Sequence, residues 1–405
     1  MYDVGLIVVL SSLILYGAAF FFVWVWRCYR RREIRMQFKD DFRPGVTILK
    51  PLAGVDEELE ANLVSFFELD YEPLQIIFGS DRDDDPGMVI ARRVAQRYPQ
   101  RDCLILTKLQ GTATSPKVVN LEAMLPHARH ELVMLSDSNV RIRRDDMKVL
   151  VQPMRDARVG LVYQPVVGEG EISAGATVEN LRLTEFCGNM TISAKMFAGQ
   201  DCVMGKGMLC RREALREIDN FAQVRDTAAD DYLLGVAIKR AGWRMRLGAV
   251  PARVIHIHWP VAAMMRRHTR HAAMRWRLNT IAYPMELLMM PLVVSLAAPL
   301  LSGVIGFYWM ALGIVGKMAI EACSARVTRG HWFSLPHTLL IPVKDGLMLV
   351  VLFRALFEST VEWRGRRYRM IGGSKLVPLD TPPTVNHQPA VTSPTAHTPP
   401  DHQPV

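Results

Sequence analysis

The strongest constraint on the fold is an uncharged apolar stretch close to the N-terminus. Residues 6–26 read LIVVLSSLILYGAAFFFVWVW and contain no charged side chain. A helix of ~20 apolar residues is long enough to cross the hydrocarbon core of a bilayer. The stretch therefore predicts a membrane-spanning helix, which ties the rest of the chain to a membrane surface.

The residues that flank this stretch indicate its orientation. Only Met1–Gly5 precede it, whereas RCYRRREIR at 27–35 follows it without a small-residue cleavage site. A signal peptide has the opposite arrangement, with basic residues ahead of the apolar core. By the positive-inside rule the basic end of a span faces the cytoplasm. We therefore expect an anchor with its basic flank over residues 1–35, followed by a cytoplasmic domain.

The net charge of +9 does not by itself indicate a nucleic-acid-binding protein, because the basic clusters lie beside apolar segments, at 27–35, 266–277 and 364–369. Anionic lipid headgroups attract such clusters by roughly 1 kcal/mol per basic residue near the surface. We expect the lipid bilayer, and no nucleic acid, as a partner. The six cysteines form no CxxC pair, so reduced thiols are expected rather than disulfides or a zinc site.

Short apolar runs alternate with helical patterns between residues 46 and 170. The strand candidates are 46–50, 74–80, 103–107, 132–138 and 160–167, and the helix candidates include 56–69 and 86–98. Apolar runs of this length, separated by helices, are typical of a parallel sheet that is buried on both faces. The pattern predicts a doubly wound α/β domain, which we place at residues 36–260.

Acidic side chains follow the predicted strands where a ligand would bind. The sequence DRDDDP at 81–86 follows the second strand, DSN at 137–139 ends the fourth, and ADDY at 229–232 precedes a helix-like run. Ligands of such sheets bind beyond the carboxyl ends of the strands. Turn formation and helix capping are the alternative roles for these acids. As a set, Asp81, Asp137 and Asp231 are predicted to contact a nucleotide, hold a divalent metal and act as a base.

Phosphate-binding glycine loops are missing from the sequence. Neither GxxxxGK[ST] nor a GxGxxG after a strand occurs, which disfavours P-loop hydrolysis and dinucleotide-dependent redox chemistry. The stretch GKGMLCRR at 205–212 resembles such a loop only superficially. We interpret it as a turn whose Lys206 can approach a phosphate.

The C-terminal part of the chain is again apolar. Residues 287–316 contain no charge and predict either one tilted span or a hairpin broken near Pro299 and Gly303. Residues 339–357 predict a span or an interfacial helix that is interrupted by charges. We expect a membrane region at 281–375, with an even number of crossings after the α/β domain, and a disordered Pro/Thr/His-rich tail at 376–405.

Several ordered motifs together resemble a known family. The chain is similar to processive-type family 2 glycosyltransferases in general and, more closely, to the ceramide glucosyltransferase family (family 21), of which it resembles a bacterial member. The matching stretches are ILKPLAGVDEEL at 48–59, SFFELDY at 65–71, FGSDRDDDP at 78–86, SPKVVNL at 115–121, LSDSNVRI at 135–142, CVMGKGML at 202–209, ADDY at 229–232, AGWR at 241–244 and WRGRRYR at 363–369.

The resemblance implies a GT-A fold with membrane helices at both ends and a specific reaction. It implies an inverting transfer of glucose from UDP-glucose to the primary hydroxyl of a ceramide-like membrane lipid. Asp231 would be the base and Asp137 would hold Mg²⁺ or Mn²⁺ on the diphosphate. Asp81 would contact the uridine, with Asp83 as the alternative register. Asn139 stands where many of these enzymes have a second acid, which implies a weakly held metal.

The resemblance also implies further substrate-binding residues. Lys117, Asp230, Arg267, Arg270 and His271 are predicted to bind substrate. The basic motif of the family, (Q/R)xxRW, fits imperfectly in the segment 261–280. The register Arg267-x-x-Arg270-His271 keeps both cations but has histidine in place of tryptophan.

The other register of the basic motif is Ala272-x-x-Arg275-Trp276, which keeps the Arg-Trp pair but loses the first cation. A basic interfacial helix that binds lipid headgroups is the alternative role for the whole segment. We prefer the first register because its two cations suit a diphosphate.

Other functions remain open at this stage. One is a bacterial transferase that moves N-acetylglucosamine or another sugar to a hopanoid or other lipid alcohol. A catalytically inactive membrane anchor belongs to a different class. A processive polysaccharide synthase is disfavoured because the chain has few spans. The predicted location is the bacterial inner membrane, or the Golgi in a eukaryote, with the catalytic domain facing the cytoplasm.

Overall fold

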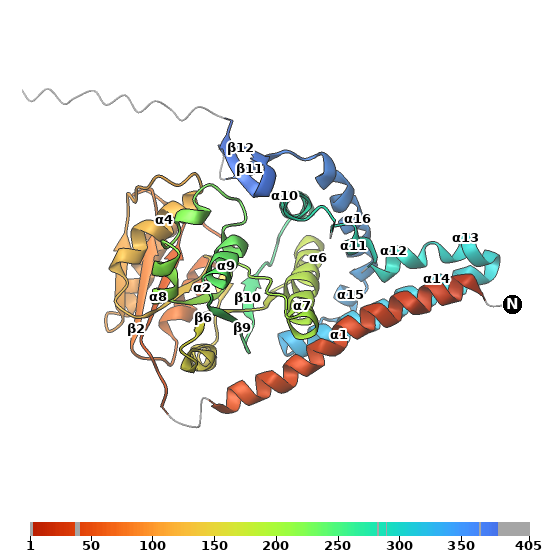
Figure 1. Cartoon of the computed structure of the whole chain (residues 1–405), viewed down its shortest axis with the longest axis horizontal. Helices are drawn as coiled ribbons and strands as arrows, with labels where there is room; N and C mark the ends of the chain where they lie inside the picture. The colour runs from red at the N-terminus through yellow and green to blue at the C-terminus, as the bar shows by residue number, and fades with distance from the viewer. Residues whose placement is uncertain (1–2, 37–40, 282, 289, 364–365, 380–405) are drawn as a thin grey trace, which may run out of the picture.

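A seven-stranded sheet forms the centre of the α/β domain in the computed structural model, which describes residues 3–36, 41–281, 283–288, 290–363 and 366–379 (Figure 1). The strand order is β3-β2-β1-β4-β8-β6-β9. In chain order these strands are β1 (Val46–Pro51), β2 (Leu74–Gly79), β3 (Asp102–Leu106), β4 (Leu132–Leu135), β6 (Val159–Tyr163), β8 (Met208–Arg211) and β9 (Arg244–Leu247).

The mostly parallel sheet confirms the predicted fold class. Strands β3, β2, β1 and β4 pair in parallel, as do β6 and β9, whereas β8 runs antiparallel to both of its neighbours. Strand β8 lies in the stretch 205–212, which we had interpreted as a turn. That interpretation holds for the start of the stretch only, because a buried strand of four residues shows no periodicity of its own.

Two of the predicted strands are shorter than expected. The predicted strand 132–138 ends at Leu135, and the predicted strand 160–167 is divided between β6 and β7 (Val166–Glu169). The break between β6 and β7 lies at Gln164–Pro165, where proline has no N–H to donate to a ladder. Strand β7 then belongs to a small sheet with β5 (Val140–Arg141) and β10 (Ala252–Ile255), whose order is β5-β10-β7.

Helices cover both faces of the large sheet. The side chains of Val46 and Ile48 on β1 share one core with α2 (Leu59–Phe67) and α3 (Pro86–Arg97). Leu49, one position further along, belongs to the opposite core with α4 (Pro116–Met124) and α9 (Asp230–Arg240). Because successive strand residues point to opposite faces, a run of consecutive apolar residues fills both cores.

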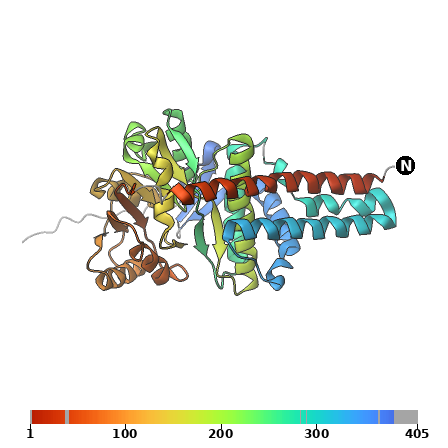
Figure 2. The same ribbon diagram turned by 90° about the horizontal axis from the view of Figure 1, so that it is seen from below.

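Among the described residues, two segments are long and apolar enough to cross a membrane, namely α1 (Val4–Met36) with a mean hydropathy of 2.5 and Pro291–Arg329 with 1.8. They lie side by side and project away from the α/β domain (Figures 1 and 2). The indole N–H of Trp26 donates to the carbonyl of Gly248 at 3.2 Å, so the end of α1 is fixed to the domain. These features support a membrane protein.

The segment Pro291–Arg329 is a hairpin. It contains α12 (Pro291–Ser295), α13 (Ala298–Ser302) and α14 (Gly306–Arg329), and the chain reverses at Gly303, whose φ is +60°. A Cβ on Gly306 would lie 2.2 Å from the carbonyl oxygen of Ala298, so the two arms touch closely. The arm formed by α12 and α13 is about 18 Å long, shorter than the ~30 Å hydrocarbon core. Of the two alternatives predicted, the hairpin is the one observed.

A long helix connects the α/β domain to the membrane helices. It comprises α6 (Ala174–Arg182), the π-helical segment η3 (Leu183–Met190) and α7 (Thr191–Ala198), and it packs against both α1 and α14. The last long helix, α16 (Ile341–Phe357), packs against α10 (Val261–Leu278). Two of the three charges that interrupt α16, Lys344 and Asp345, are buried and form ion pairs with other helices, whereas Arg354 is exposed.

A three-stranded sheet follows α16 and returns to the α/β domain (Figure 1). Its strands are β11 (Thr360–Trp363), β12 (Arg366–Ile371) and β13 (Lys375–Pro378). The tail predicted to begin at residue 376 therefore begins too early, because 376–378 are paired with β12. Residues 380–405 of that predicted tail, and residues 364–365 of the matching stretch WRGRRYR, lie outside the described residues.

Candidate active site

The predicted acids lie at the carboxyl edge of the large sheet. Asp137 follows β4 and Asp81 follows β2, with β1 between these strands, so the strand ends are about 10 Å apart. Asp81 is exposed and, among the described residues, makes no hydrogen bond or ion pair. Asp83 instead pairs with Lys108 at 3.1 Å and Arg92 at 3.5 Å. Asp81 therefore has the free carboxylate, which favours it over Asp83 as the nucleotide contact.

Asp137 is surrounded by lysines. Its Oδ2 lies 2.6 Å from the ammonium of Lys206 and its Oδ1 lies 3.3 Å from that of Lys117. Burial disfavours a charged carboxylate, but the two ammonium groups outweigh burial and hold the pKa of Asp137 well below its usual range. Asp137 is therefore ionised at any physiological pH.

Lys117 links the acid after β4 to the acids of α9. Its ammonium lies 3.3 Å from Oδ1 of Asp137 and 3.3 Å from Oδ2 of Asp230. Burial alone would lower the pKa of Lys117, but the nearby carboxylates outweigh it and raise that pKa. Burial raises the pKa of Asp230 to about 6, and the charges of Asp231 and Asp137 add to this effect against the opposing charge of Lys117. One partly buried cation thus connects Asp137 to Asp230, the residue before Asp231.

Asp231 is held by backbone donors. Its Oδ2 accepts a hydrogen bond from the N–H of Gly205 at 2.5 Å, and its Oδ1 accepts one from the N–H of Tyr232 at 2.8 Å. A Cβ on Gly205 would lie 2.6 Å from Nζ of Lys117 and 3.1 Å from Oδ2 of Asp231, so a larger residue there would displace the ammonium of Lys117. The turn at 205–206 therefore brings Lys206 to Asp137 and orients the carboxylate of Asp231 at the same time.

The structure adds a lysine that the sequence interpretation did not single out. Lys50, at the end of the central strand β1, is fully buried and donates to the carbonyl oxygen of Asp137 at 2.6 Å. Burial lowers the pKa of Lys50 to about 7, against the opposing charge of Asp137. The only sequence signal for Lys50 was its position as a basic residue within the apolar run 46–50.

The residues after β4 fit a divalent cation. Oδ2 of Asp137 and Oδ1 of Asn139 lie 2.6 Å and 3.0 Å from the same atom, Nζ of Lys206, so the ammonium of Lys206 occupies the position that a bound cation would take. Carboxylate and amide oxygens are ligands that Mg²⁺ and Mn²⁺ accept. The predicted metal residue is therefore chemically suited to that role.

A second group of acids lies between the membrane-associated helices and is already neutralised. Carboxylate oxygens of Glu185, Glu321 and Asp345 lie within 4.8 Å of one another. Lys317 and Lys344 each contact all three acids, at distances from 2.5 to 3.3 Å. Because two lysines occupy the position of an ion, this group is an ion-pair network that joins η3 to α14 and α16.

The predicted basic motif lies on α10, next to the site. Arg267 contacts Oε1 of the fully buried Glu179 and Nε2 of His256, each at 3.2 Å. Burial lowers the pKa of His256 to about 3, and the charges of Arg267 and Lys206 contribute to this shift. His256 is therefore neutral. It contacts Arg267 of α10, and the charge of Lys206 acts on it from the turn at 205–206.

Arg270 and His271 follow on the same helix and are largely shielded from water. Burial lowers the pKa of Arg270 to about 10, with a contribution from Arg267, so Arg270 is charged at neutral pH. Burial also lowers the pKa of His271 well below its usual range, which makes this ring neutral. Roles of these residues in substrate binding remain predictions.

The alternative register of the basic motif has a structural partner instead. The guanidinium of Arg275 binds both carboxylate oxygens of Glu286, at 2.7 and 3.0 Å. Trp276 packs edge-on against Tyr283 with ring centroids 5.5 Å apart. Both side chains of that register therefore anchor the end of α10.

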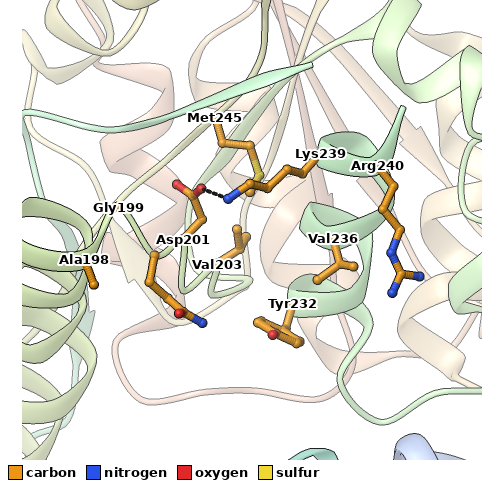
Figure 3. Close-up of a pocket in the computed structure, with 10 residues that line it drawn as sticks. Ala198, Gly199, Asp201, Val203, Tyr232, Val236, Lys239, Arg240 and Met245 are labelled. Atoms are coloured by element: carbon orange, nitrogen blue, oxygen red, sulfur yellow. Dashed lines mark hydrogen bonds and ion pairs between the residues drawn. The ribbon is translucent and has the colours of Figure 1, made fainter. Parts of the chain in front are cut away.

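A hollow of about 390 Å³ lies on the outer side of α9 (Figure 3). Tyr232, Val236 and Arg240 line it from α9, and Asp201 forms an ion pair with Lys239 across it at 3.0 Å. None of the predicted site residues is among its lining. The hollow adjoins the acids only through Tyr232, which follows Asp231 in the chain.

Comparison with known proteins identifies relatives over nearly the whole chain. The model of "Glycosyl transferase family 21" matches residues 6–376. Ceramide glucosyltransferase 3 of Caenorhabditis elegans is 22% identical over 371 residues, which cover 86% of this chain and 78% of the relative. Ceramide glucosyltransferase 1 of the same organism is 22% identical over 379 residues, which cover 88% and 77%.

Among solved structures, the chain is similar to a mannosyltransferase from Pyrobaculum calidifontis in complex with GDP-Man and Mn²⁺. The two are 19% identical, with a TM-score of 0.47, and the match covers 86% of this chain and 98% of the other.

Proposed function

Because this chain belongs to glycosyl transferase family 21, and is therefore a glycosyltransferase, we propose that it moves glucose from UDP-glucose to the primary hydroxyl of a ceramide-like membrane lipid. The observation that carries the proposal is the contact of Lys117 with both Asp137 and Asp230. This contact joins the place expected for the donor diphosphate to the place expected for the base. The names of the relatives support the sugar and the acceptor.

Asp231 is the proposed base. The N–H groups of Gly205 and Tyr232 orient its carboxylate, which accepts the proton of the acceptor hydroxyl as that oxygen bonds to the anomeric carbon. The bond between this carbon and the diphosphate oxygen breaks on the opposite face, so the configuration at the anomeric carbon inverts. Because two backbone donors hold the carboxylate, it cannot rotate freely and keeps one orientation for proton transfer.

The diphosphate leaves with additional negative charge. Lys206 lies beside Asp137 at the end of β4 and supplies a positive charge there, and Arg267 and Arg270 are the proposed cations on the side of α10. Asp137 and Asn139 would hold Mg²⁺ or Mn²⁺, which when bound neutralises charge on the diphosphate. Asp81, at the end of β2, is proposed to contact the uridine. Lys117 keeps the neighbouring acids paired while the donor binds.

The lipid acceptor is supported by the attachment of the site to membrane helices. The helix α6-η3-α7 packs on α1 and α14, so the α/β domain sits against the membrane segments. The arginines at 27–35 support a cytoplasmic face. The hydrogen bonds between the C-terminal sheet and the α/β domain support an even number of crossings between them.

The test uses the full chain purified into nanodiscs with Mn²⁺. UDP-glucose and UDP-N-acetylglucosamine are each supplied with ceramide or a hopanoid, and the lipid products are identified by mass spectrometry. We expect glucosylceramide from the wild type and a loss of 10²- to 10⁴-fold in kcat for Asp231→Asn. Asp219→Asn is the matched control, because Asp219 is exposed and has a φ of 57° that asparagine tolerates.

Two results would contradict the proposal. If Asp231→Asn were as active as Asp219→Asn, then Asp231 would not be the base. If the wild type transferred N-acetylglucosamine, or used only the hopanoid, the donor or the acceptor assignment would be wrong even with the base correct.

A further inference from the structure

The C-terminal sheet pairs with the loop that leads into the acids of α9. The N–H of Ala228 donates to the carbonyl of Ser374 at 3.0 Å, and the N–H of Leu376 donates to the carbonyl of Asp226 at 2.7 Å. Thr227 and Lys375 form an antiparallel β-bridge between these two bonds. The loop is thus joined to β13 by a single β-bridge, and Asp230 follows it after a single further residue.

The opposite side of this loop is bound to the start of α4. The N–H of Ser115 donates to the carbonyl of Arg225 at 3.1 Å. The hydroxyl of Thr114 donates to the carboxylate of Asp226 at 2.5 Å. Helix α4 begins at Pro116 and carries Lys117 in its first turn. The loop is therefore clamped between β13 and the segment that positions Lys117.

The sheet also packs on the basic helix α10. Tyr368, Met370 and Leu376 are 2–3% exposed and share a core with Met264 and Ala272 of α10. A second link lies near the end of α10. The guanidinium of Arg277 donates to the carbonyl of Glu358, two residues before β11, at 2.7 Å. A single small sheet thus contacts the loop before the base and the helix with the predicted diphosphate cations.

We propose that β13 is a positioning element of the active site: its pairing with residues 226–228 sets the place of Asp231 relative to Lys117. The inference rests on the proposed role of Asp231 as base. The sheet follows the last long helix, α16, and joins parts of the site that are far apart in sequence. A misplacement of reacting groups by ~1 Å can cost about 10²-fold in rate, so a two-bond contact at this point is enough to control turnover.

The direction of the backbone groups allows a selective test. Residues 374 and 376 face the same edge of β13, whereas β12 pairs along the other edge. Leu376→Pro removes the N–H that binds Asp226. Leu376→Ala is the matched control, because it shortens the same buried side chain and keeps the N–H.

We expect the proline variant to lose at least 10-fold in kcat with its KM for the donor unchanged within about 2-fold. The alanine variant should keep more than a third of the wild-type kcat. If both variants lost the same activity, the side chain and not the pairing would matter, and the inference would fail. A rise in the donor KM that accounted for the whole loss would also overturn it.

A disulfide provides a rescue that a merely structural role would not predict. Residues opposite each other on antiparallel strands have Cα atoms about 4.5–5.5 Å apart, within the range of a disulfide. Thr227→Cys with Lys375→Cys in the Leu376→Pro background should restore kcat to at least half of the wild-type value when oxidised and lose it again on reduction. Formation of the bond is verified by mass spectrometry, and the two single cysteine variants are the controls.

The oxidised rescue also covers a proline variant that does not fold by itself. If the oxidised variant were folded, as judged by its melting temperature, and still inactive, the inference would be wrong. A failure of the proposed base would look different. In that case Asp231→Asn would be active, whereas the comparison between the two Leu376 variants can be made on whatever transfer reaction the wild type performs.

Discussion

Replacing Asp230 by asparagine is expected to stabilise the protein at neutral pH. Asp230 is 8% exposed and lies among Lys117, Asp231 and Asp137. Burial raises the pKa of Asp230 from 3.8 to about 6, with a contribution from the two neighbouring acids and against the opposing charge of Lys117. At neutral pH, ionising the carboxylate of Asp230 therefore costs more free energy in the folded protein than in the unfolded chain.

The size of this effect follows from the shift. A rise of roughly 2 pKa units, at 1.36 kcal/mol each, corresponds to about 3 kcal/mol. Because the pKa is higher in the folded state, the folded protein binds the proton more tightly between about pH 4 and pH 6. Stability is therefore lost as the pH rises through this window and stays low above it. At pH 5 only about half of the free-energy cost of ionising Asp230 is present.

Asparagine has nearly the same shape and carries no charge, and its carbonyl oxygen can still accept from Lys117. Thermal unfolding of the purified protein at pH 7.5 should show Asp230→Asn melting about 5 °C above the wild type. At pH 5 the difference should shrink to about half. The exposed variant Asp219→Asn should match the wild type at both pH values. A variant that melted at or below the wild-type temperature at pH 7.5, or a difference that did not shrink at pH 5, would refute the reasoning.

Three further substitutions test other parts of the structure. Gly205→Ala places a Cβ 2.6 Å from Nζ of Lys117, so kcat should fall at least 10-fold with little change in melting temperature; an unchanged kcat would contradict this packing. Asp137→Ala should abolish Mn²⁺ binding in calorimetry, and excess Mn²⁺ should not restore activity; unaltered binding would exclude Asp137 as a metal ligand. Lys344→Met leaves Glu185 short of a buried partner and should cost about 3–5 kcal/mol, seen as a lower melting temperature in detergent; unchanged stability would show that the network is dispensable.

Features that repeat over short distances were predictable from the sequence. The apolar stretch at 6–26 identified α1, and the apolar runs between residues 46 and 170 identified most strands of the large sheet, because hydrophobic periodicity reflects local burial. The strand-end positions of Asp81 and Asp137 followed from the same pattern, since the carboxyl ends of parallel strands meet at one edge. The family resemblance, which rests on ordered motifs, was confirmed.

Other features needed pairs of residues that lie far apart in the chain. The sequence did not indicate that Lys50 would lie beneath Asp137, because a lysine within an apolar run carries no sign of its partner. The charges in α16 looked like interruptions of a span, but Lys344 faces Glu185, 159 residues away.

The sequence by itself determined the membrane anchor, the doubly wound fold and the identity of the acids at the sheet edge. Only the tertiary structure decided which lysines neutralise those acids, that residues 291–329 form a hairpin, and that β13 pairs with the loop before Asp230. The physical reason is that burial and periodicity are properties of neighbouring residues. Ion pairs and strand pairing depend instead on which distant segments the packing of the whole chain brings within a few ångströms.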